Sequence, residues 1–127
     1  MNKITLYEIL ISATIMLLLD SIYLSSFKKY FNKVFHSIQG SEIKIKYSGV
    51  FLCYIVLLFG INYFIISRRA SLLDAFILGF VIYAVYETTN YATLDNWPIF
   101  MILLDSLWGG ILLMITTFIT YNIIHKY

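Results

Sequence analysis

The sequence predicts an all-α polytopic membrane protein with four transmembrane helices and a short amphipathic helix at the membrane interface. Its 127 residues are 61% hydrophobic and only 13% charged, whereas soluble domains are about one quarter charged and expose a large surface to water. Four apolar runs each approach the roughly 20 residues that cross a bilayer. Most of the charged residues lie between these runs. We expect one domain over residues 1–127.

The four predicted spans show no alternation of polar and apolar residues, which the strands of a membrane β-barrel would require. They cover Leu6–Ser26, Ser48–Ser67, Ser71–Leu94 and Pro98–Tyr121. A cleavable signal peptide is the alternative for the first run, but Asp20 interrupts its apolar core and the segment before it has little basic charge. Four spans predict a multi-pass membrane protein with both termini on the same side.

The connection between the first two spans has a helical pattern of its own. Its apolar residues recur at helical spacing, and its polar residues take the opposite face. The apolar set is Phe27, Tyr30, Phe31, Val34, Phe35 and Ile38, and the polar set is Lys28, Lys29, Asn32, Lys33 and His36. This pattern is typical of a basic helix in the headgroup region. The alternative, a simple extension of the first span into water, would expose the phenylalanines.

The link between the third and fourth spans predicts a tight helical hairpin. Pro98 suits the first turn of a helix, and we expect Trp97 to lie in the aromatic belt at the membrane surface. Small residues spaced four apart allow close helix contact. These pairs are Ala75 with Gly79 and Ser106 with Gly110.

Acidic residues lie inside three of the four spans, and ionisable residues within a membrane are functional candidates. Asp20, Glu87 and Asp105 each lie six or seven residues from the same end of the bundle. At about 1.5 Å per residue, all three are roughly 10 Å below one surface. Helical spacing adds polar and aromatic neighbours on the same faces. The predicted binding pocket comprises Asp20, Tyr54, Tyr83, Glu87, Asn90, Asp105 and Trp108.

The chemistry of this pocket stays open between several alternatives. The spans contain no lysine or arginine to neutralise the acids. Burial and like charges favour protonated carboxyl groups, but an external cation or a water-filled cavity would also stabilise them. Hard cations prefer such oxygen ligands, although no spacing fixes a ligand geometry and no cofactor is expected.

The functional hypothesis is that the pocket handles a proton, a cation or a small cationic ligand. One alternative is a structural or accessory protein whose acids only specify helix packing. Another is an enzyme acting on a lipid-like substrate, although no phosphate loop, nucleophile elbow or zinc-protease motif is present. The predicted partners are the lipid bilayer and further copies of this small bundle. We find no nucleic-acid-binding module.

One segment also carries a family resemblance. Tyr86–Leu94 reads Tyr-Glu-Thr-Thr-Asn-Tyr-Ala-Thr-Leu, and Trp-Pro and Asp-Ser-Leu-Trp-Gly follow it. This segment resembles the bacterial membrane proteins grouped as domain of unknown function 2177, in which an aspartate takes the place of Glu87. Asp20 also matches an acid in that family's first span. The resemblance implies a four-span fold and points to the same pocket.

Overall fold

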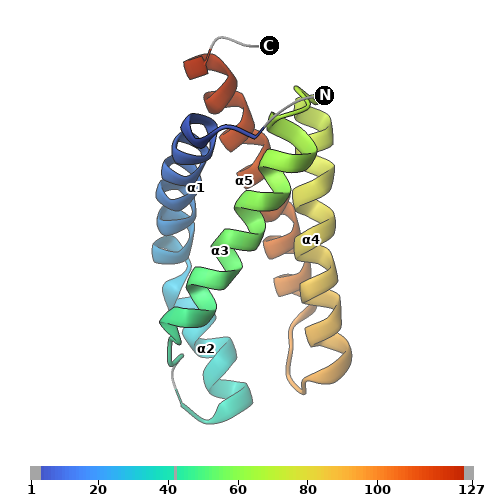
Figure 1. Ribbon diagram of the computed structural model, residues 1–127. Coiled ribbons are helices and arrows are strands. Elements are labelled where there is room, and N and C mark those ends of the chain that lie inside the picture. Colours follow the sequence, from blue (N-terminus) through green and yellow to red (C-terminus); the bar gives the residue numbers. More distant parts are fainter. Residues whose placement is uncertain (1–3, 42, 125–127) are drawn as a thin grey trace.

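Figure 1 shows the computed structural model of the protein, which describes residues 4–41 and 43–124. The elements are α1 (Leu6–Ser26), α2 (Lys28–Gln39), α3 (Tyr47–Ile61), the π-helical segment η1 (Asn62–Ile66), α4 (Leu72–Thr93) and α5 (Ile99–Ile124). Within the described ranges the chain forms helices and turns and no strand. The all-α prediction is therefore confirmed.

The four predicted spans are confirmed by four helices long and apolar enough to cross a membrane. They are α1, α3 with η1, α4 and α5. Their outward surfaces carry large apolar side chains, which suits a lipid environment and not water. Examples are Leu18, Phe51, Val56, Val85 and Phe118, each at least half exposed.

Local sequence signals explain where several helices begin and end. The Thr5 Oγ1 atom accepts a hydrogen bond from the Glu8 backbone N–H at 3.2 Å, and Ser71 Oγ accepts one from the Asp74 N–H at 3.0 Å. These contacts cap the first turns of α1 and α4. Gly40, with φ of 75°, ends α2 in the left-handed conformation that glycine adopts without strain.

The two helices in closest contact are α4 and α5, which run side by side in Figure 1. Gly79 and Gly109 meet at their interface. A Cβ atom added to Gly79 would lie only 2.1 Å from the Gly109 carbonyl oxygen, so the two backbones touch directly. Small residues make such an approach possible between membrane helices, which confirms the prediction of close contact there.

The α2 helix is amphipathic, as predicted, but protein covers the middle of its apolar face. Phe31 and Val34 are buried in a cluster with Trp97 and Met101. The ring of Phe35 meets the Trp97 ring edge-on at 5.6 Å. The α4–α5 turn thus supplies an aromatic surface on which α2 docks, while the lysines of α2 remain exposed.

A polar cluster of Glu8, Asn62 and Arg69 lies at the end of the bundle opposite α2. The Arg69 Nη2 atom is 2.6 Å from Oε2 of Glu8, whose side chain is only 2% exposed. The side-chain amide of Asn62 donates hydrogen bonds to Ser12 Oγ at 3.1 Å and to the Leu58 carbonyl at 2.9 Å. Asn62 begins η1, so the π-helical distortion lies where a polar side chain turns inward between the helices.

In a membrane, the four-span topology predicts that Ile4 and Arg68 face one side and Lys33 the other. Cysteines introduced at these positions in a Cys53→Ala background should react with an impermeant maleimide from opposite sides. We expect Ile4→Cys and Arg68→Cys to label together in sealed vesicles of one orientation. Labelling of Lys33→Cys from that same side would contradict the four-span topology.

Candidate functional site

The three acids predicted to lie at one depth are the centre of a hydrogen-bonded network that joins α1, α3, α4 and α5. Asp20 of α1 is its first member and is 7% exposed. The Trp108 Nε1–H of α5 donates to Asp20 Oδ1 at 2.9 Å. The Tyr54 hydroxyl of α3 donates to the other oxygen of the same carboxyl group. Asp20 therefore ties three helices together through donors that carry no charge.

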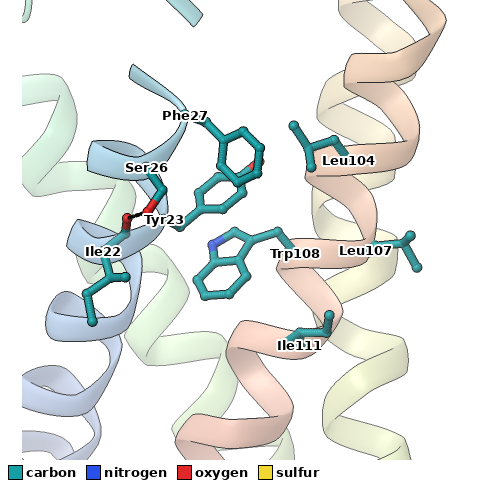
Figure 2. Close-up of a pocket in the computed structure, with 8 residues that line it drawn as sticks. All are labelled: Ile22, Tyr23, Ser26, Phe27, Leu104, Leu107, Trp108 and Ile111. Carbon is teal, nitrogen blue, oxygen red and sulfur yellow. Dashed lines mark hydrogen bonds between the residues drawn. The ribbon is translucent and has the colours of Figure 1, made fainter. Parts of the chain in front are cut away.

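Tyr23 connects this first carboxyl group to the second. It lies on α1 one turn after Asp20, and its hydroxyl donates to Asp105 Oδ1 at 2.9 Å. Its ring stacks on the Trp108 ring with centroids 4.6 Å apart and an interplanar angle of 6°. Figure 2 shows these two rings face to face between α1 and α5. Asp20 and Asp105 are thus held on either side of one aromatic stack.

Glu87 of α4 is the most buried of the three acids, with no exposed surface. Trp97 Nε1–H donates to its Oε1 atom at 2.9 Å. Its Oε2 atom is buried and has no hydrogen-bond donor. The Asp105 carboxyl group lies within hydrogen-bonding reach of Glu87. Two acidic side chains therefore meet in the protein interior.

The structure brings Tyr83 near this network but does not join Asn90 to it. Tyr83 is close enough to Asp20 and Asp105 to interact with their charges, and its ring packs over Gly109. Asn90 instead lies beside the Tyr86 hydroxyl on the same helix. The α4 residues that helical spacing placed on one face therefore do not all join the network. Asn90 lies three residues beyond Glu87 and nearer the end of the helix.

The electrostatics of the site are those of acids without a cation. Among the described residues, the ion pair is that of Arg69 with Glu8, at the other end of the bundle. Across residues 4–41 and 43–124, no group of three or more His, Cys, Asp or Glu side chains is placed to hold a metal ion. The geometry therefore gives no support to the alternative in which all three acids bind one hard cation.

Outside the spans, the acids still affect one residue of α2. Partial burial and the neighbouring Glu87 carboxyl group raise the pKa of the Tyr30 hydroxyl. Tyr30 also meets Phe100 edge-on, with ring centroids 5.6 Å apart. The docked α2 helix therefore lies over the same end of the bundle as the acids.

The expectation that Trp97 lies in the membrane surface belt was wrong. Its side chain is only 4% exposed and points inward to Glu87. The reason is the short α4–α5 turn, in which Asn96 adopts a left-handed conformation with φ of 65°. That turn folds the chain back within ten residues of Glu87, and α2 covers the ring from outside. The sequence signal for this contact was the position of Trp97, ten residues after the intramembrane acid Glu87 and directly before Pro98.

Replacing Trp97 with phenylalanine should destabilise the protein by about 1–3 kcal/mol, because the buried Oε1 atom of Glu87 would lose its hydrogen-bond donor. Unfolding by SDS in mixed micelles measures this change. Benzothienylalanine at the same position keeps the two-ring shape and removes only the N–H donor, so it should also destabilise the protein. A benzothienylalanine variant as stable as the wild type would show that Trp97 acts by packing alone.

Comparison with known proteins agrees with this architecture. The model of a family described as "Predicted membrane protein (DUF2177)" matches residues 5–122. No curated protein and no solved structure matched the chain. The matched range contains every residue of the hydrogen-bonded network.

Proposed function

The chain belongs to the family of predicted membrane proteins DUF2177, and we propose that its role in the membrane is proton transfer centred on the Glu87–Asp105 pair. The observation that carries this proposal is the contact of two carboxyl groups, one fully buried, without a basic partner in the described part of the chain. Two carboxylates this close cannot readily both be ionised. A single shared proton removes one charge and supplies the missing donor.

The membrane location strengthens this argument. A charged carboxylate at the centre of a spanning helix costs about 2.5–3.5 kcal/mol on insertion scales. Trp97 and Tyr23 each donate one hydrogen bond to the pair, which stabilises one negative charge but does not neutralise two. One proton between Glu87 and Asp105 leaves a single negative charge with two neutral donors.

The network contains groups that can pass on a proton and groups that can only position the carboxyl groups. An indole N–H is a donor only, so Trp97 and Trp108 position the carboxyl groups. A tyrosine hydroxyl both donates and accepts, so Tyr23 and Tyr54 can exchange protons with Asp105 and Asp20. In this proposal protons therefore move through the hydroxyl groups of Tyr23 and Tyr54.

The same face of α1 continues toward the polar cluster of Glu8, Asn62 and Arg69. Glu8, Ser12, Met16, Asp20 and Tyr23 are its buried residues. Met16 separates the two polar groups and is fully buried within the apolar core. A proton that crosses the whole bundle must pass this apolar layer, so we expect slow, gated transfer rather than an open channel.

Proton uptake by liposomes carrying the purified protein tests this function. A potassium diffusion potential supplies the driving force, and a trapped pH-sensitive dye reports the interior pH. We expect faster uptake than in empty liposomes and slower uptake with Tyr23→Phe, which keeps the ring but removes the hydroxyl. Tyr7→Phe, on an exposed position of the same helix, should match the wild type. Wild-type liposomes no faster than empty ones would favour a packing role for the acids.

A further inference from the structure

An apolar groove lies between α1 and α5 on the outer surface of the bundle, and its lining includes the Tyr23 and Trp108 rings of the network. Figure 2 shows its two walls. Ile22 of α1 and Phe27, the residue directly after α1, line one wall. Leu104 and Ile111 of α5 line the other wall, with the stacked Tyr23 and Trp108 rings between them. Its volume is about 420 Å³, which is within the range of small-molecule sites.

The walls of this groove suit a hydrocarbon chain and not a polar ligand. Its one hydroxyl-bearing side chain besides Tyr23 is Ser26, whose Oγ already donates to the Ile22 carbonyl at 2.7 Å. The Tyr23 hydroxyl is likewise engaged with Asp105. Because the other lining residues belong to two membrane spans and only Phe27 lies beyond one, most of this groove faces the hydrocarbon interior of the bilayer.

Two lysines follow directly after the segment of α1 that lines the groove. The α1 span ends at Ser26, Phe27 lines the groove, and Lys28 and Lys29 follow directly at the start of α2. Both lysines are exposed, and neither forms an ion pair within the described residues. Lysines just beyond the end of a span lie at the level of the lipid headgroups, where they attract anionic lipids.

We propose that this groove binds one acyl chain of an anionic phospholipid, whose phosphate group contacts Lys28 and Lys29. The apolar walls hold the chain and the two lysines select the headgroup charge. The bound chain would cover the outer face of the Tyr23–Trp108 stack. This binding does not depend on proton transfer, so either proposal can fail while the other stands.

Quenching of tryptophan fluorescence by brominated lipids tests the proposal in the full-length protein. Trp108 lines the groove, whereas Trp97 is buried elsewhere and adds a nearly constant background. Brominated phosphatidylglycerol at low mole fraction in phosphatidylcholine vesicles should bind at least about fivefold more tightly than brominated phosphatidylcholine. Fivefold is the factor that one lysine supplies near an anionic surface.

Two pairs of variants separate the headgroup contact from the chain contact. Lys28→Gln with Lys29→Gln should abolish the preference for phosphatidylglycerol, whereas Lys44→Gln with Lys46→Gln changes net charge equally and should preserve it. Ile22→Phe should fill the groove and reduce quenching. Leu18→Phe, one turn away and also exposed, should leave quenching unchanged.

Three results would overturn the proposal. The first is equal quenching of the wild type by the two brominated lipids. The second is an equal loss of preference in both double lysine variants. The third is protection of Trp108 from both lipids that disappears when the protein is diluted in excess lipid, because a second copy of the chain would then occupy the groove.

Discussion

Replacing Glu87 with glutamine is expected to slow proton uptake by liposomes carrying the protein at least about a hundredfold, the lower range of losses when an acid–base group is removed. Glutamine has nearly the same shape, and its carbonyl oxygen can still accept the hydrogen bond from Trp97. Its amide can donate to Asp105 but cannot release a proton. The variant should therefore fold normally and transfer poorly.

Asp74→Asn is the matched control for this variant. Asp74 lies in the first turn of the same helix, and its side chain is exposed, so the substitution removes one acid from α4 without touching the network. We expect uptake close to the wild-type rate. If Glu87→Gln transported protons as fast as Asp74→Asn, the carboxyl pair would have no part in transfer.

Replacing Gly79 with leucine is expected to destabilise the protein by at least about 3 kcal/mol, the upper end of the usual range for overpacking. The new Cβ atom would stand 2.1 Å from a backbone oxygen of Gly109, which no side-chain rotation relieves. The α4 and α5 helices would have to separate. Since Glu87 and Asp105 lie on these two helices, the carboxyl contact should be lost with the packing.

Gly60→Leu provides the control for that prediction. Gly60 is also a glycine in a spanning helix, but a Cβ atom there would meet nothing within 4 Å. Its substitution should change the free energy of unfolding by no more than about 0.5 kcal/mol. Unfolding by SDS in mixed micelles measures both variants. Equal stabilities for Gly79→Leu and Gly60→Leu would contradict the close α4–α5 contact.

The spans and the level of the acids could be predicted from sequence because they depend on local rules. Apolar length fixes a span, and a constant rise per residue fixes depth. Counting residues therefore placed Asp20, Glu87 and Asp105 at one level. In the structure Trp108 bonds Asp20, Tyr23 bonds Asp105, and Asp105 lies within hydrogen-bonding reach of Glu87. The amphipathic pattern of α2 likewise predicted a helix.

Contacts that depend on how separate elements pack could not be predicted in the same way. Tryptophan is a residue type common at the membrane surface. Only the tight α4–α5 turn and the docked α2 helix make Trp97 a buried hydrogen-bond donor. Glu8 and Arg69 are 61 residues apart in sequence, so no local spacing indicates their ion pair. Asn90 lies at helical spacing from Glu87, but that spacing does not show whether a side chain of a neighbouring helix lies close enough to bond it.

Infrared titration of the carboxyl C=O stretch is the most direct test of the shared proton. The wild type should show the band of a protonated carboxyl group at neutral pH, and the pair should lose its protons in two coupled steps. That band should disappear in Glu87→Gln, change in Asp105→Asn and persist in Asp74→Asn. A wild-type spectrum without a protonated carboxyl group at neutral pH, or a band that neither Glu87→Gln nor Asp105→Asn alters, would contradict a proton held between Glu87 and Asp105.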